Sequence, residues 1–257
     1  MNKKIDLIIL FFYFIIGAAF CYIFKINAFG SILVFFGLPS LYLTIRNPKY
    51  IKKSIIFSFI LGVPMIILID YIAHLTGQWI IPHSILPYRL FTYVSVEVIF
   101  WAILNVYSVV IFYEYFLNHR STDKVWLPHM KYLLSFVSFL FVLFLIFYYF
   151  LPNLLHIPYF YLMFGIFWIF IPLLIHFILH PNFLGRFLEV AAYFFYVTFL
   201  YEIVALKVGW WDFPGKQFVG WIHIFNVKFP IEELVFWLLL FAMIVLAIYE
   251  YFDDDEK

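Results

Sequence analysis

Long apolar stretches recur along the whole chain and constrain its fold more than any other feature. Crossing the hydrocarbon core of a bilayer takes about 20 consecutive apolar residues of helix. The predicted helices cover residues 5–24, 28–45, 54–73, 91–117, 132–151, 159–179, 187–206 and 230–252. Hydrophobic residues make up 67% of the chain and charged residues only 12%, unlike a soluble domain. We therefore predict an all-α integral membrane protein with eight transmembrane helices.

The basic residues are unevenly divided between the two ends of these helices. One side carries Lys3, Lys4, Arg46, Lys49, Lys52, Lys53, Arg120, Lys124, Lys131, Arg186 and Lys257. The other side carries Lys25, Arg89, Lys207, Lys216 and Lys228. Because loops rich in Lys and Arg stay in the cytoplasm, we expect a multi-pass protein of the plasma (inner) membrane with both termini cytoplasmic. The net charge of +1, without a basic patch, does not indicate a nucleic-acid partner.

A pattern of an acid, Ala, Gly, Trp and Pro occurs twice in the sequence. The first copy consists of Asp70, Ala73, Gly77, Trp79 and Pro82. The second copy lies at one constant offset and consists, in the same order, of Glu202, Ala205, Gly209, Trp211 and Pro214. A second match, between residues 97–101 and 233–237, follows at a slightly longer offset. The two copies lie four helices apart, so both run the same way through the membrane. We therefore predict two parallel repeats related by a pseudo-twofold axis along the membrane normal.

These repeats divide the predicted chain into five parts. Residues 1–27 form an additional first helix, 28–117 the first repeat, 118–158 a linker with the fifth helix, and 159–252 the second repeat. The acidic residues 253–257 are expected to form a solvated tail. Other acids, including Asp6, Glu114 and Glu250, are expected at cytoplasmic helix ends. This predicted arrangement is compatible with a homo-oligomer.

Ionisable residues at membrane depth are costly, and they therefore point to function. The acids near the outer ends of the predicted helices are Asp70, Glu97, Glu202, Glu232 and Glu233. Across a pseudo-twofold axis they would converge on one cavity. Capping of a helix start, or pairing with basic residues of the same side, is the structural alternative. Capping does not explain Asp70 and Glu202, because the helix dipole disfavours an acid near a helix C-terminus.

Aromatic residues accompany two of these acids at helical spacing. The two helix faces consist of Tyr93, Glu97 and Trp101, and of Phe229, Glu233 and Trp237. Together with Trp79 and Trp211, these rings are expected to bind a substrate, because ring faces stabilise a cation. Anchoring at the membrane interface is the alternative for Trp79, Trp210 and Trp211.

The sequence lacks the motifs of several cofactors. No Gly-x-Gly-x-x-Gly follows a strand pattern, so we expect no bound flavin or nicotinamide. No lysine lies in the middle of a predicted helix, which argues against a retinal Schiff base. His74, His83 and His223 match no ligand spacing, and Cys21 is the single cysteine, so we expect no metal site. Redox-neutral chemistry driven by carboxylates fits these absences.

The repeated acid-x-x-Ala-x-x-x-Gly-x-Trp pattern, followed by the tetrapeptide Pro-Ile-Glu-Glu at 230–233, resembles the membrane-embedded lycopene cyclases of the heterodimeric type in their fused, two-domain form. The resemblance covers most of the chain from about Ala28. It implies two domains of three helices in a lipid bilayer, a linear carotenoid such as lycopene as substrate, and no cofactor. An acid would protonate the terminal double bond, the cation would close a ring, and a base would remove a proton.

The resemblance also implies roles for the acids. Glu232 and Glu233 match the acid/base pair of that family, and Glu202 and Asp70 match its acid before the Trp. A proton donor must be neutral, and apolar burial and a neighbouring carboxylate both favour the neutral form of a carboxylic acid. The first copy departs from the pattern, since only Glu97 opens its helix and no proline precedes it. It is expected to bind substrate without catalysis or to act on a different end group.

Two other functions fit the same features. One is a hydratase of carotenoid end groups, or another membrane enzyme that modifies isoprenoids, on the same scaffold. The other is a small proton-coupled transporter, for which parallel repeats and paired carboxylates are also suitable. The position of the acids near one face, and not at the middle of the bilayer, favours the enzyme.

Overall fold

The computed structural model of the chain describes residues 3–118 and 129–253. Arg120, Lys124 and Lys257 of the charge comparison, and the acidic tail beyond residue 253, lie outside the described residues. In the described part, seven helices are long and apolar enough to span a membrane, and an eighth candidate span consists of two helical pieces that meet at a 45° bend. The prediction of an all-α, multi-pass membrane protein is confirmed.

The first half of the chain contains four of these spans. Its elements are α1 (Lys3–Ile23), α2 (Ala28–Ile32), η1 (Leu33–Gly37), α3 (Leu38–Arg46), η2 (Pro48–Tyr50), α4 (Ile51–Leu75), β1 (Arg89–Leu90), β2 (Val94–Ser95) and α5 (Val96–Phe116). The π-helical η1 joins α2 and α3 into one span. Asn27 caps the start of this span, because its Oδ1 accepts a hydrogen bond from the backbone N–H of Gly30 at 2.8 Å.

The second half contains the other four spans. Its elements are α6 (Met130–Phe150), η3 (Pro152–Leu155), α7 (Phe160–Phe164), η4 (Gly165–Phe170), α8 (Ile171–Leu179), η5 (Pro181–Phe183), α9 (Leu184–Val208), β3 (Trp221–Ile224), β4 (Val227–Pro230), η6 (Glu233–Leu239) and α10 (Phe241–Asp253). The order of elements from α2 to α5 therefore recurs from α7 to α10. In both halves a span with a π-helical middle precedes a 25-residue helix, an antiparallel hairpin and a final span.

Two predicted helices start later than the sequence indicated. α5 begins at Val96, because Arg89 and Ser95 pair across the hairpin β1–β2. The last span begins near Glu233, because Pro230 is still in β4, where it pairs with Trp221. The interruption between η6 and α10 was not predicted either. In both halves, the hairpin places the acids at the start of the following helix directly beside a loop.

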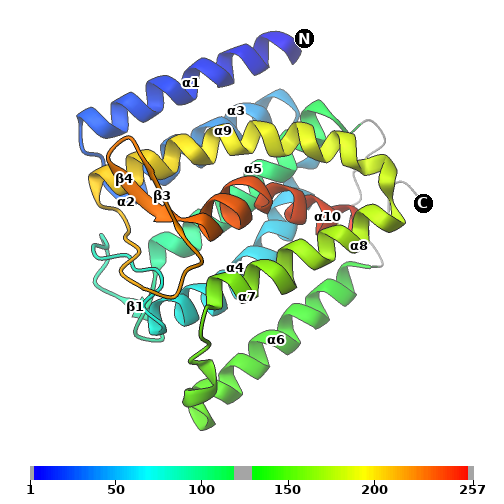
Figure 1. Cartoon of the computed structure of the whole chain (residues 1–257). Coiled ribbons are helices and arrows are strands. Elements are labelled where there is room, and N and C mark those ends of the chain that lie inside the picture. The colour runs from blue at the N-terminus through cyan, green and yellow to red at the C-terminus, as the bar shows by residue number, and fades with distance from the viewer. Residues whose placement is uncertain (1–2, 119–128, 254–257) are drawn as a thin grey trace.

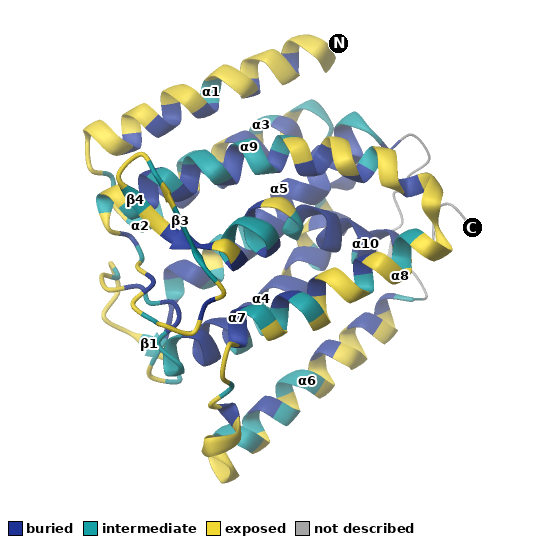
Figure 2. Cartoon of the chain, in the orientation of Figure 1, coloured by how far each residue is buried: buried dark blue, intermediate teal, exposed yellow. Residues whose placement is uncertain are grey.

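Helix α5 is the most buried span, and α1 and α6 lie at opposite edges of the bundle (Figure 1). α1 packs against α9, and α6 packs against α4. Figure 2 shows that the outer faces of α1, α6 and α8 are largely exposed. Their exposed side chains are apolar, for example Ile16, Phe139 and Ile178. Such faces suit a bilayer, because lipid tails are as apolar as these side chains.

A buried polar network ties the helices together at the end of the bundle opposite the hairpins. Asp6 on α1 is fully buried and accepts hydrogen bonds from Arg46 at 2.6 Å and from Tyr115. Glu114 on α5 is also buried and lies 3.6 Å from the Nζ of Lys53 on α4. These acids were expected at helix ends, and the structure shows that they fasten the ends of α1, α3, α4 and α5.

We expect Gly165→Ala to destabilise the protein by about 1–3 kcal/mol, as overpacking of a dense core does. Gly165 lies in η4, and an added Cβ would come within 2.0 Å of the ring of Phe236 in η6. Thermal unfolding in detergent measures the effect. Gly185→Ala on α9 is the control, because its added Cβ lies within 4 Å of none of the described residues apart from its chain neighbours and the backbone of its own helix. Equal unfolding temperatures for the two variants would contradict this packing.

Candidate functional site

A cavity of about 50 Å³ lies between the two halves, at the end of the bundle that carries the hairpins. Three of the predicted acids line it, namely Glu97, Glu202 and Glu233. Its other walls are mainly aromatic, and they include Trp79, Trp101, Tyr161, Tyr201, Trp210, Trp211 and Trp237. Carboxyl groups thus face an enclosed space whose remaining surface is largely apolar.

Glu202 lies near the C-terminal end of α9 and is buried. The helix ends at Gly209, whose φ of 81° is in the left-handed region that glycine adopts without strain. This turn brings Trp211 back over the last turns of α9, where its indole N–H donates to Oε1 of Glu202 at 3.2 Å. Its neighbour Trp210 donates to the carbonyl oxygen of Ile26 at 2.8 Å. The glycine therefore places an indole N–H beside the buried acid.

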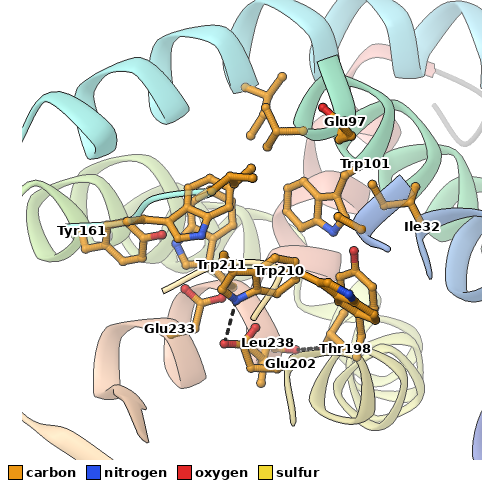
Figure 3. A pocket seen from close by; sticks show the side chains of 17 residues that line it. Ile32, Glu97, Trp101, Tyr161, Thr198, Glu202, Trp210, Trp211, Glu233 and Leu238 are labelled. Atoms are coloured by element: carbon orange, nitrogen blue, oxygen red, sulfur yellow. Dashed lines mark hydrogen bonds between the residues drawn. The ribbon is translucent and has the colours of Figure 1, made fainter. Parts of the chain in front are cut away.

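Glu233 is the first residue of the π-helical η6 and faces Glu202 across the cavity floor. Figure 3 shows the two carboxyl groups side by side below the indole of Trp211, and the charge of Glu202 acts on Glu233. The hydroxyl of Tyr161 on α7 is within electrostatic range of Glu202, Glu233 and Asp70. Two acids therefore share one small space, in the arrangement that general acid/base chemistry requires.

Glu97 and Glu232 hold the loops that precede their helices. Glu97 accepts hydrogen bonds from the hydroxyl of Ser84 at 2.6 Å and from the N–H of Ile85 at 2.5 Å. Glu232 accepts from the N–H of Val219 at 2.6 Å and is not among the cavity-lining residues. Figure 3 shows that Glu97 lies beyond Trp101, away from the other two acids of the cavity. Of the expected pair, Glu232 therefore binds a loop, and Glu233 lines the cavity.

Three other predicted site residues do not line the cavity. Asp70 is buried on α4, and its Oδ2 accepts no hydrogen bond from the described residues. Arg89, which the structural alternative would pair with these acids, donates to the carbonyl oxygens of Tyr93 and Ile81 at 2.8 and 2.7 Å and also acts on Asp70 through its charge. The ring of Tyr93 stacks on His74 with centroids 4.7 Å apart. Phe229 is fully buried in β4.

Several residues that match in the sequence repeat contact each other. The rings of Trp79 and Trp211 lie 6.3 Å apart, and those of Trp101 and Trp237 lie 6.4 Å apart. Ile80 and Asp212, which directly follow Trp79 and Trp211, form two reciprocal N–H···O bonds of 3.0 Å. All of these contacts lie around the cavity or at its edge.

Several cavity residues were not predicted from the sequence. The chain contains 20 tyrosines. Tyr161 and Tyr201 lie in long apolar helices, and nothing in their spacing distinguishes them from the others. Anchoring at the membrane interface was the alternative considered for Trp210, but this residue is buried and lines the cavity. The indole N–H of Trp101 also lies at the cavity, and no described residue accepts a hydrogen bond from it. Trp210 directly precedes Trp211, and its position beside this predicted aromatic site residue is the signal that could have indicated it.

Comparison of the sequence with protein-family models and curated proteins, and of the fold with solved structures, finds no match. In the described part of the chain, no three His, Cys, Asp or Glu side chains are grouped closely enough to hold a metal ion. The chemistry of the cavity can therefore be read only from its own residues. They offer two adjacent carboxyl groups for proton transfer, and ring faces that stabilise positive charge.

Proposed function

We propose that the chain is a membrane carotenoid cyclase of the lycopene-cyclase type, which closes the linear end groups of a carotenoid into rings. The observation that carries this proposal is the pair Glu202 and Glu233, side by side in a cavity walled by tryptophans. The paired acids supply the proton transfers, and the apolar walls suit a hydrocarbon. The membrane is the plasma (inner) membrane in this proposal, with both termini in the cytoplasm, as the distribution of Lys and Arg supports.

The reaction moves one proton in and one proton out. A carboxylic acid protonates the terminal carbon–carbon double bond, and the resulting tertiary cation accepts an electron pair from a double bond further along the polyene. That step forms the ring bond and moves the positive charge onto a ring carbon. A carboxylate then removes a proton next to this carbon, which leaves a ring double bond. Substrate and product have the same mass and the same oxidation level.

We assign the proton donor to Glu233 and the base to Glu202. Trp211 donates a hydrogen bond to Glu202, and such a bond favours the ionised carboxylate. Among the described residues, none donates a hydrogen bond to Glu233. No such bond therefore stabilises its carboxylate, which suits the role of a protonated donor. The two acids together need to carry only one proton, as in other carboxyl pairs. This assignment differs from the pair Glu232–Glu233 that the sequence suggested.

The ring faces of Trp101 and Trp237 support the same reaction. Their centroids are 6.4 Å apart, and both rings line the cavity that the acids face. A cation near the face of Trp gains about 0.5–2 kcal/mol, more when it is desolvated. The cation of the proposed reaction forms beside the carboxylates of Glu233 and Glu202, and the ring faces lower its energy without forming a bond to it.

Duplication of an ancestral unit explains the recurring order of elements and the contacts between matching residues. Around a twofold axis a residue close to the axis touches its own counterpart, as the pairs Trp79–Trp211 and Ile80–Asp212 do. In this proposal Glu97 corresponds to Glu232, because each lies two residues after its hairpin and binds a loop N–H. Val98 then stands in the place of Glu233. The sequence match of Glu97 with Glu233 is one residue off, since the π-helical η6 contains an additional residue.

Expression of the chain in cells that accumulate lycopene tests the proposal. We expect the red pigment to be replaced by an orange or yellow product of unchanged mass that contains a ring. A product heavier by one water would indicate the hydratase, and unchanged lycopene would contradict both enzymes. Transport of protons without any change in the pigment would favour the carrier.

We expect Glu232→Gln to retain most of the ring-closing activity. Glu232→Ala should lower this activity about tenfold or more, because loss of a charge-assisted hydrogen bond costs about 1.5–3 kcal/mol. Gln keeps an oxygen that accepts the N–H of Val219, and Ala does not. The measurement is the rate of product formation in membranes with equal amounts of each variant. Equal and complete loss in both variants would show that Glu232 takes part in proton transfer.

A further inference from the structure

A second cavity adjoins the one that holds the acids. Its volume is about 150 Å³, and it lies between α4, α5, α6, η4 and the last span. Ile66, Trp101 and Trp237 line both cavities, so these three side chains form a shared wall. Among the described residues, those that line the second cavity include no acidic or basic side chain. The space is therefore suited to hydrocarbon that continues from a group placed beside Glu202 and Glu233.

The outer boundary of this cavity lies at the lipid-facing side of the bundle. Phe136 on α6 is 49% exposed and Trp168 on η4 is 39% exposed, and both line the cavity. Their ring centroids are 6.1 Å apart. These two exposed rings therefore lie where the cavity meets the lipid-facing surface, one on α6 and one on η4.

The volume limits what the cavity can hold. An apolar cavity of about 150 Å³ accommodates about one benzene-sized group. A carotenoid is many times longer, so only the part next to its end group fits inside the protein. The remainder has to extend past Phe136 and Trp168 into the lipid.

We propose that the second cavity binds the polyene segment next to the reacting end group of a long linear isoprenoid, which enters from the bilayer between α6 and η4. This inference rests on the proposed function for the identity of the hydrocarbon. The end group passes between Trp101 and Trp237 to reach the acids, and the far end of the molecule stays in the membrane.

The corresponding place in the other half is much smaller in the part of the chain that the structure describes. Where the proposed duplication places a counterpart, a cavity of only about 10 Å³ remains. It is filled by Phe112 and Tyr193, which stack with centroids 4.0 Å apart. In the proposed duplication these two correspond to Ile248 and Leu61, which line the open cavity. Among the described residues, the larger of the two corresponding cavities is therefore the one that adjoins the pair Glu202 and Glu233. In this proposal a substrate with two reactive ends leaves and rebinds between the two ring closures.

The experiment compares two identical substitutions on α6. Val137 is 2% exposed and lines the second cavity, whereas Val142 is 53% exposed and does not. Each is changed to Phe in a Glu233→Gln background, so that lycopene is bound but not converted. Ile248→Phe is a third variant, which introduces the ring that fills the corresponding place in the other half. The proteins are purified in detergent from lycopene-producing cells, and the ratio of lycopene to protein is read from absorbance.

We expect Val137→Phe and Ile248→Phe to lower bound lycopene at least about fivefold, because extra atoms in a filled apolar space cost binding energy, while Val142→Phe leaves it unchanged. Elution as a single monodisperse peak shows that each variant is folded, and Ile248→Phe decides the test if Val137→Phe is not. Lycopene that stays bound equally in all three would overturn the inference. So would loss of co-purified phospholipid alone, since the cavity would then hold acyl chains. Failure of the parent chain to form rings, with lycopene binding as expected, would contradict the proposed function only.

Discussion

Replacement of Glu233 by Gln should reduce ring closure at least about a hundredfold, because a positioned general acid contributes about 10²–10⁴ in rate. Gln has the same size but carries no carboxyl proton, so the terminal double bond is never protonated. The measurement is the conversion of lycopene in membranes, by chromatography of the pigments. Bound lycopene should stay at the level of the unmodified chain, because the change leaves the apolar walls intact.

Glu189→Gln is the control for a general effect of removing an acid, since Glu189 is exposed on α9. It should convert lycopene at the unmodified rate. Ring formation by Glu233→Gln at more than a few per cent of that rate would show that another group donates the proton.

Replacement of Glu202 by Gln should also reduce ring closure at least about a hundredfold, since the base acts in the same proton-transfer cycle. The expected result differs from that of Glu233→Gln in the products. Without its carboxylate the ring cation still forms slowly, but it loses its proton to other acceptors, so the ratio of ring double-bond isomers should change. Chromatography and mass spectrometry of the residual product measure this ratio.

A purely structural role of Glu202 would lower the yield without changing the isomer ratio. Both variants lie on the same cavity, so equal amounts of folded protein are the necessary comparison. If Glu202→Gln gives no product at all while Glu233→Gln gives an altered isomer ratio, the two roles are exchanged.

Much of the fold follows from hydropathy, because long apolar runs have few alternatives to a spanning helix. The ends of the helices do not follow from it. Residues 91–95 contain Phe, Tyr and Val and could extend the helix after them, but they belong to a hairpin in which Arg89 pairs with Ser95 and Leu90 with Val94. The bend near Leu240 likewise depends on packing between helices, and no proline marks it. Tertiary contacts decide such boundaries.

The site was predictable in its residue types but not in the direction of each side chain. Glu232 and Glu233 are neighbours at a helix start, and successive side chains on a helix point about 100° apart. Only one of them can face the cavity, and the sequence does not say which. The structure turns Glu232 to the N–H of Val219 and leaves Glu233 beside Glu202. Such a choice depends on the loop before the helix, whose conformation no local pattern encodes.

The packing of the two edge helices has a consequence for how this protein can be divided. α1 belongs to the first half of the sequence but covers α9, while α6 belongs to the second half and covers α4. Each half thus lends an arm to the other, in the manner of exchanged segments in a swapped dimer. A half made on its own would lack the helix that packs on its longest one, so we expect two gene fragments that encode the halves to give more folded protein together than either gives alone.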